Sequence, residues 1–190
     1  QFARRYLEAL SVTDRQRARE EYPRLVEITG DREIRYDFVL FQKEEGNFGQ
    51  ALAGLGPLLL GERTEGKYLL LECELLALLQ RKEEAVRHYR DLLDRELDSM
   101  ADPAFIQDIL SSFRTFLQTH YPFREAESLL LASLSARTDP FSLLTVARFY
   151  EEAGDRGEAR SWYYRAYRSD SIRGGPLYAW FCYRNGDNRE

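Results

Sequence analysis

The chain has 190 residues and a formal net charge of −5, with 44% hydrophobic and 31% charged residues. This length is typical of a single domain, and the apolar content is sufficient for a sizeable buried core. Residues 36–136 carry 10 basic and 17 acidic side chains. Because nucleic-acid-binding proteins need a basic stripe that neutralises phosphates, this acidic middle argues against nucleic acid as a partner.

From the N-terminus onward, apolar residues recur every three or four positions, which predicts amphipathic helices. Such runs cover residues 34–41, 68–79, 105–117 and 143–150, and each precedes a break that is followed by a second run. Breaks along the chain include Thr13-Asp14, Gly46-Asn47, Tyr121-Pro122 and Gly154-Asp155. Glycine can end a helix in a left-handed conformation, and Asp or Asn can cap the next helix. Connections this short force consecutive helices to lie antiparallel.

A fixed alanine site marks five successive copies of this helix pair. The site is occupied by Ala18, Ala51, Ala85, Ala126 and Ala159, at spacings of 33, 34, 41 and 33 residues. Four residues later each alanine is followed by a large side chain, namely Tyr22, Leu55, Tyr89, Leu130 or Tyr163. A small residue allows two helix axes to approach closely, and the large residue one turn later fills the space against the neighbouring pair. The spacing therefore predicts an internal repeat.

Three further segments indicate where the repeats meet. Asp102-Pro103 and Asp139-Pro140 each combine an N-cap residue with a first-turn proline, which predicts the start of a first helix. The longer spacing around residues 96–103 predicts a lengthened second helix or a loop. Gly174-Gly175-Pro176 predicts a turn between repeats.

The C-terminal residues resemble the start of a sixth copy. Gly154-Asp155 recurs as Gly186-Asp187, close to the end of the sequence. The last predicted helix carries Tyr178, Trp180, Phe181 and Tyr183, and a solenoid repeat needs a neighbour to cover such an apolar face. We therefore expect the chain to be a fragment of a polypeptide that continues past Glu190. We expect the uncovered helix to hide its apolar face by self-association, a lattice contact or fraying.

These patterns resemble the tetratricopeptide repeat family, whose 34-residue motif places W-x2-L-G-x2-Y in the first helix and A-x3-F in the second. The fifth copy matches in register at Leu143, Val146, Ala147, Tyr150, Gly154, Ala159, Tyr163 and Ala166. The second copy matches at Phe38, Val39, Gly46, Phe48, Ala51, Leu55 and Leu58, and the third at Leu69, Cys73, Leu76, Ala85 and Tyr89. The first and fourth copies are degenerate, and Arg114 stands where the motif needs a small residue.

The resemblance implies an all-α fold, a right-handed superhelical solenoid of antiparallel helix pairs with about five repeats plus the first helix of a sixth. The implied repeats form one domain and cover residues 1–30, 31–64, 65–101, 102–138, 139–171 and 172–190.

The same resemblance implies a concave groove, lined by the first helices, that binds a peptide or a partner helix. The corresponding groove residues are Tyr36, Leu40, Lys43, Leu70, Glu74, Ser111, Thr115, Gln118, Leu144, Arg148, Glu151 and Trp180. One subset of the family clamps the C-terminal carboxylate of a chaperone with Lys and Asn at successive groove positions. The equivalent pairs in this chain lack that combination: Tyr36/Leu40, Leu70/Glu74 and Leu144/Arg148.

Candidates for catalysis or metal binding are few. Glu84, His88 and Asp91 share one face of a predicted helix, but metal sites usually draw ligands from several elements, so a solvated charged face is the simpler interpretation. Cys73 occupies a small-residue site, which predicts a buried and inert thiol, and Cys182 is expected to pack among aromatic residues. We expect no enzyme active site, no metal and no cofactor.

The most apolar stretch, residues 69–79, contains two glutamates and is shorter than the ~20 residues of a membrane span. The sequence therefore favours a non-enzymatic scaffold or adaptor that binds a protein or peptide. Two alternatives are a structural spacer and a regulatory segment of a larger protein, with the groove filled in cis. A third, disfavoured by the acidic middle, is an RNA-binding helical repeat.

Overall fold

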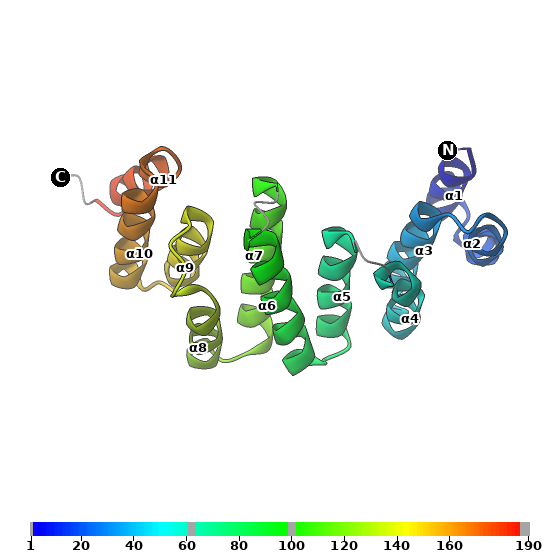
Figure 1. Cartoon of the computed structure of the whole chain (residues 1–190), viewed down its shortest axis with the longest axis horizontal. Coiled ribbons are helices and arrows are strands. Elements are labelled where there is room, and N and C mark those ends of the chain that lie inside the picture. The colour runs from blue at the N-terminus through cyan, green and yellow to red at the C-terminus, as the bar shows by residue number, and fades with distance from the viewer. Residues whose placement is uncertain (1, 61–63, 99–101, 187–190) are drawn as a thin grey trace. The chain divides into compact units, whose positions relative to one another are not determined.

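The computed structural model describes residues 2–60, 64–98 and 102–186, with the side chain of Asp98 left aside. All regular structure in these residues is helical, with eleven α-helices and no strand, which confirms the prediction of an all-α chain. The helices, drawn in Figure 1, are α1 (Phe2–Thr13), α2 (Arg15–Thr29), α3 (Arg32–Glu44), α4 (Phe48–Leu59), α5 (Gly66–Leu78), α6 (Lys82–Asp98), α7 (Pro103–His120), α8 (Phe123–Leu134), α9 (Pro140–Glu152), α10 (Arg156–Ser169) and α11 (Ser171–Arg184).

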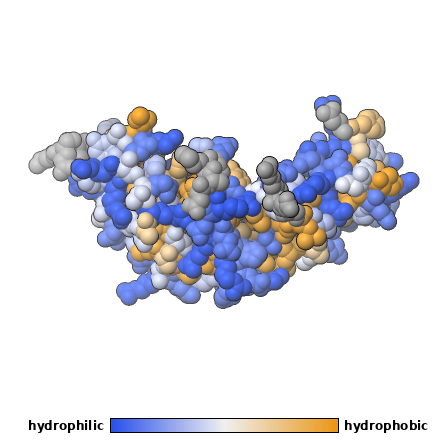
Figure 2. Space-filling view, in the orientation of Figure 1, coloured by the Kyte–Doolittle hydropathy of each residue, from blue (hydrophilic) through white to orange (hydrophobic). Residues whose placement is uncertain are grey.

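The chain divides into two compact units, unit 1 (Gln1–Leu92) and unit 2 (Leu93–Glu190). In unit 1, each helix from α1 to α4 packs on the next helix, and α1 also contacts α3. In unit 2, α7 packs on α8, α8 on α9, α9 on α10 and α10 on α11, while α9 also contacts both α7 and α11. Odd-numbered helices therefore lie against one another within each unit, as well as against their partners in sequence. Hydrophilic residues cover most of the visible face of each unit, with apolar patches between them (Figure 2).

The five alanines of the predicted register are completely buried in the structure, each with 0% of its surface exposed. The large residues four positions later are also buried, and they form the centre of the packing. In unit 1, the Tyr22 ring lies 5.4 Å from the Phe38 ring and 5.2 Å from the Phe41 ring, so one aromatic side chain on α2 binds two turns of α3. In unit 2, Tyr163 on α10 lies 5.0 Å from Phe181 on α11. The small alanine allows the helices to approach closely, and the large residue packs against the next helix.

Helix ends follow the predicted chemistry at most breaks. The Asp14, Asp102, Asp139 and Asp155 side chains accept hydrogen bonds from backbone N–H groups in the first turn of the helix that follows each of them. Gly46 and Gly154 adopt left-handed conformations, with φ of 77° and 82°, which ends α3 and α9 at little steric cost. Asn47 differs from the expectation, because it makes no side-chain capping bond to α4. For the longer spacing around residues 96–103, α6 extends over 17 residues to Asp98, whereas residues 99–101 of that segment lie outside the described residues.

The prediction of a turn at Gly174-Gly175-Pro176 is wrong, because all three residues lie inside α11. Asp170 caps this helix by accepting hydrogen bonds from the N–H groups of Ile172 and Arg173, so α11 has already begun before the glycines. A Cβ atom at Gly174 would lie 2.5 Å from the carbonyl carbon of Ala166 on α10. The glycine is therefore required for the close crossing of two helices and does not mark a loop.

Candidate functional site

In unit 1, the predicted groove residues lie on the neighbouring helices α3 and α5, and several are already paired with each other. Lys43 Nζ of α3 donates a 2.5 Å hydrogen bond to Glu74 Oε2 of α5. The Tyr36 ring of α3 lies 5.2 Å from the Tyr68 ring of α5. Tyr36, Leu40, Leu70 and the ion-paired Lys43 and Glu74 are all half-buried. This part of the predicted groove is thus occupied largely by contacts within the chain.

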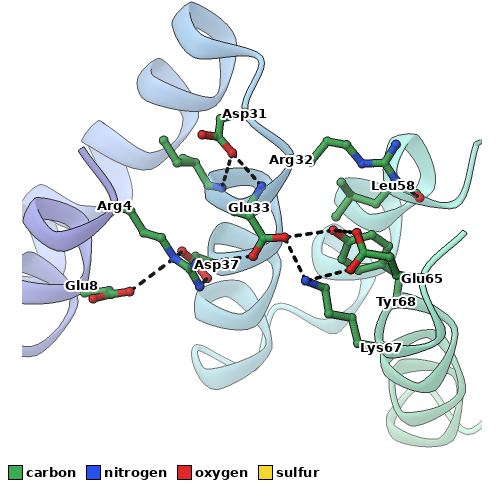
Figure 3. A network of polar contacts seen from close by, with 11 residues as sticks. Arg4, Glu8, Asp31, Arg32, Glu33, Asp37, Leu58, Glu65, Lys67 and Tyr68 are labelled. Carbon is green, nitrogen blue, oxygen red and sulfur yellow. Dashed lines mark hydrogen bonds and ion pairs between the residues drawn. The ribbon is translucent and has the colours of Figure 1, made fainter. Parts of the chain in front are cut away.

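A polar network joins α3 and α5 to each other and to α1 (Figure 3). Arg4 Nε of α1 donates to Asp37 Oδ2 of α3 at 2.6 Å, and Lys67 Nζ of α5 donates to Glu33 Oε1 of α3 at 2.8 Å. The Lys67 ammonium also lies 5.2 Å from the centre of the Tyr36 ring, at cation–π distance. Because Glu33 and Asp37 lie one turn apart on α3, this helix is held to both of its odd-numbered neighbours by charged pairs.

Two carboxyl groups of this network have pKa values shifted in opposite directions. The hydrogen bond from Lys67 lowers the pKa of Glu33, although burial opposes the shift. Burial raises the pKa of Asp37, and the hydrogen bond from Arg4 only partly offsets that effect. Ionised Glu33 therefore stabilises the fold above its ordinary pKa of 4.5, and this contribution is lost as the pH falls through the lower folded value. Ionisation of Asp37 has the opposite effect and lowers the free energy of unfolding, because burial disfavours the charged carboxylate in the fold.

The substitution Glu33→Gln is expected to lower the free energy of unfolding at pH 7 by about 0.5–1 kcal/mol, the size of a partly exposed ion pair. The difference from the unsubstituted chain should vanish once the pH lies below the lowered pKa of folded Glu33, where the carboxylate is protonated. Glu27→Gln, at an exposed position of α2, is the matched control and should have no effect at either pH. Urea unfolding followed by circular dichroism measures both; an equal loss for Glu33→Gln at the two pH values would contradict the assignment.

In unit 2, the predicted groove residues lie on α7, α9 and α11 and are less completely paired. Ser111, Thr115 and Gln118 are exposed along α7, and Gln118 Nε2 donates to Glu152 Oε2 of α9 at 2.9 Å. Arg148 of α9 is exposed, whereas Leu144 is buried with 7% of its surface exposed.

Two further groove residues lie near the C-terminal ends of their helices. Glu151 Oε2 of α9 accepts a 2.7 Å hydrogen bond from the Tyr163 hydroxyl of α10. Trp180 of α11 is 49% exposed, with the Arg184 guanidinium 4.9 Å from its ring centre. Tyr183 of the same helix is also exposed, whereas Phe181 is buried and Tyr178 stacks against Tyr167. The aromatic face that we expected to be uncovered is therefore only partly exposed.

A cavity of about 40 Å³ lies among α7, α9 and α11. Three of the predicted groove residues line it, namely Ser111, Leu144 and Arg148. The other lining residues are Gln107 and Arg114 of α7, Phe141 and Thr145 of α9, and Leu177 of α11. The structure thus brings predicted positions from α7 and α9 together, while Thr115, Gln118, Glu151 and Trp180 lie outside the lining of this cavity.

Sequence reasoning missed Arg114 as a site residue, although its unusual place in the predicted repeat was a visible signal. Its side chain is only 13% exposed, and Nη1 lies 3.1 Å from Glu152 Oε1 of α9. Phe141 and Leu177 were also missed, and each lies three residues before a predicted groove position, Leu144 or Trp180. On a helix, residues three apart share a face, so these two side chains extend the same surface.

The candidates for catalysis and metal binding do not assemble into a site. No group of three His, Cys, Asp or Glu side chains within the described ranges could hold a metal ion. His88 Nδ1 lies 3.0 Å from Glu72 Oε2 of α5, and Glu84 pairs with Arg81, so the predicted face is divided between two separate contacts. Cys73 is buried, and burial raises the pKa of its thiol, which keeps it protonated and unreactive.

Across residues 2–60, 64–98 and 102–186, no helix has the length and apolarity needed to cross a membrane. In the comparisons with known proteins, no family model matches the sequence and no curated protein matches it.

Proposed function

We propose that this chain is a tetratricopeptide-like solenoid that acts as a non-enzymatic scaffold or adaptor and binds a protein segment on its odd-numbered helices. Three features support the repeat: short breaks between the helices, five buried alanines in register, and contacts between odd-numbered helices within each unit. In such repeats the first helices form the concave face, which receives an extended peptide or a partner helix.

The observation that carries the proposal is the cavity in unit 2. Three residues that the family resemblance assigns to a binding face line one cavity between α7, α9 and α11, namely Ser111, Leu144 and Arg148. Leu144 offers an apolar wall, whereas Ser111 and Arg148 offer polar groups at its rim. A mixed surface of this kind suits a segment that presents both apolar and polar side chains.

Unit 1 favours a structural role for its own part of the chain. Its odd-numbered helices are already joined by Lys43–Glu74, Lys67–Glu33 and Arg4–Asp37, so a ligand would have to displace internal ion pairs. We therefore place ligand binding in unit 2 and a spacer role in unit 1. The structural-spacer alternative therefore applies to unit 1 only.

A display selection with random 16-residue peptides tests the proposed function. Peptides selected on the whole chain should lose at least tenfold in affinity for Ser111→Trp, because an indole ring at this exposed lining position of α7 obstructs access to the cavity. Ser128→Trp, exposed on α8, is the matched control and should bind normally. Fluorescence polarisation measures the affinities, and circular dichroism verifies that both variants fold.

Two results would contradict the proposal. One is a selection that yields no peptide with measurable affinity. The other is a set of peptides whose binding is equally sensitive to Ser111→Trp and Ser128→Trp, since that would place binding away from the cavity.

Binding of nucleic acid is expected to be weak and abolished by moderate salt. The middle of the chain carries 10 basic and 17 acidic side chains, so few counterions are released on contact with phosphates. A salt titration with labelled single-stranded RNA checks this expectation. A sub-micromolar complex at physiological salt would favour the RNA-binding alternative.

A further inference from the structure

The cavity between α7, α9 and α11 combines two arginines with apolar walls. Arg114 and Arg148 are among its lining residues, together with Phe141, Leu144 and Leu177, and none of the described residues that line it is acidic. Its volume of about 40 Å³ is far below the ~300–1,000 Å³ of small-molecule sites. A space of this size holds a few water-sized groups, which corresponds to the end of one side chain.

Arg114 has hydrogen-bonding capacity that the chain leaves unused. Its Nη1 atom contacts Glu152, but its Nε atom is buried and has no hydrogen-bond partner within the part of the chain that the structure describes. A guanidinium carries five N–H donors in a fixed plane, and leaving a buried donor unpaired is energetically costly. Because Arg114 lines the cavity, an oxyanion held there would supply acceptors for its guanidinium.

The positive charge of Arg148 is likewise available at the cavity. This side chain is exposed, and its positive charge acts on the Tyr163 hydroxyl of α10. Burial raises the pKa of Tyr163, so this hydroxyl is neutral at pH 7 and does not cancel the charge of the guanidinium. The nearby Glu151 carboxylate accepts a hydrogen bond from the Tyr163 hydroxyl, and its Oε1 atom lies 3.5 Å from Arg184 Nη1. Two arginines therefore line one cavity, and a carboxylate is the group that best matches their guanidinium donors.

Apolar side chains from two helices indicate that the ligand carries an apolar group beside its carboxylate. Phe141 and Leu144 of α9 and Leu177 of α11 form the apolar part of the lining. A carboxylate alone would leave this surface in contact with water, whereas a neighbouring aliphatic side chain would cover it.

We propose that the cavity binds an acidic side chain of a partner segment, with an Asp or Glu carboxylate pairing with Arg114 and Arg148. An adjacent aliphatic side chain of the same segment packs on Phe141, Leu144 and Leu177. The proposal rests on the proposed function and defines its ligand as an acidic, amphipathic protein segment.

Titration with 4-methylpentanoate, which joins a carboxylate to an isobutyl group, tests the chemistry directly on the whole chain. The Nε–Hε resonances of Arg114 and Arg148 and the methyl resonances of Leu144 and Leu177 should shift and saturate together in NMR spectra. The neutral analogue 4-methylpentanamide has nearly the same shape, and we expect it to bind at least fivefold more weakly, because its neutral carbonyl forms no ion pair with the guanidinium groups and accepts weaker hydrogen bonds from them.

Substitutions of single arginines measure how much their positive charge contributes to binding of 4-methylpentanoate. Arg148→Gln is expected to weaken binding of 4-methylpentanoate about five- to tenfold, and its exposed position makes misfolding no concern. Arg168→Gln removes one charge from an exposed position of α10 and is the matched control, with no expected change. Arg114→Gln should weaken binding as well; if circular dichroism shows that this partly buried variant is unfolded, Arg148→Gln decides the question.

Several outcomes would overturn the proposal. Equal binding of the acid and the amide, or unchanged binding by Arg148→Gln, would show that the cavity recognises no carboxylate. Tighter binding of methyl phosphate than of 4-methylpentanoate would assign the oxyanion to a phosphate group instead. Selected peptides that bind at this face without enrichment in Asp and Glu would overturn the inference and leave the proposed function intact. Saturable 4-methylpentanoate binding with no selected peptide would contradict the proposed function alone.

Discussion

The substitution Gly174→Ala is expected to lower the free energy of unfolding of unit 2 by about 2–3 kcal/mol, because it forces two helix backbones apart. The new Cβ atom would lie 2.5 Å from the carbonyl carbon and 2.6 Å from the carbonyl oxygen of Ala166 on α10. These are backbone atoms, so rotation of a side chain cannot relieve the clash. Both tryptophans of the chain, Trp162 and Trp180, lie in unit 2, and their fluorescence during urea unfolding reports on this unit.

The neighbouring glycine provides a control of opposite sign. At Gly175 a Cβ atom would lie 3.6 Å from Cδ2 of Tyr167, which is an ordinary van der Waals contact. Gly175→Ala is therefore expected to stabilise unit 2 by about 0.4–1 kcal/mol, because alanine restricts the unfolded chain more than glycine does. If both substitutions shift the unfolding midpoint equally, the close crossing of α10 and α11 is not the reason for Gly174.

The substitution Ala159→Leu is expected to destabilise unit 2 by about 1–3 kcal/mol through overpacking. Ala159 has 0% of its surface exposed, and it lies on α10, which packs on both α9 and α11. Three additional carbon atoms at this site must displace neighbouring side chains or separate the helices. Tryptophan fluorescence during urea unfolding again measures the change.

Ala136→Leu is the control for this experiment, because Ala136 is exposed in the turn after α8. A surface substitution of this kind should change the free energy of unfolding by less than about 0.5 kcal/mol. Equal midpoints for Ala159→Leu and Ala136→Leu would mean that the alanine register does not define the packing of the helices.

Features that depend on a few neighbouring residues could be predicted from the sequence. Asp102 and Asp139 cap the helices that follow them because each side chain needs to reach a backbone N–H only two or three residues away. The burial of the five alanines was also predictable, because it follows from a repeated helical register. Local sequence was insufficient at Gln80, which takes a left-handed conformation with φ of 61° at the end of α5 without the glycine that usually marks such a position.

Features that depend on the crossing of helices could not be predicted in the same way. A Gly-Gly-Pro segment resembles a turn, and only the approach of Ala166 shows that Gly174 belongs to a helix interface. The cavity required the relative placement of α7, α9 and α11, whose lining residues extend from Gln107 to Leu177. Arg114 was visible as an exception to the repeat, but its buried Nε and its contact with Glu152 became clear only in the structure.

The most direct test of a binding face on α7, α9 and α11 is NMR mapping of the whole chain with the tightest peptide from the display selection. We predict that the largest amide and side-chain shift changes fall on Gln107, Ser111, Arg114, Phe141, Leu144, Thr145, Arg148 and Leu177, which line the cavity. Changes concentrated on α8 and α10, with the cavity residues unmoved, would contradict the account.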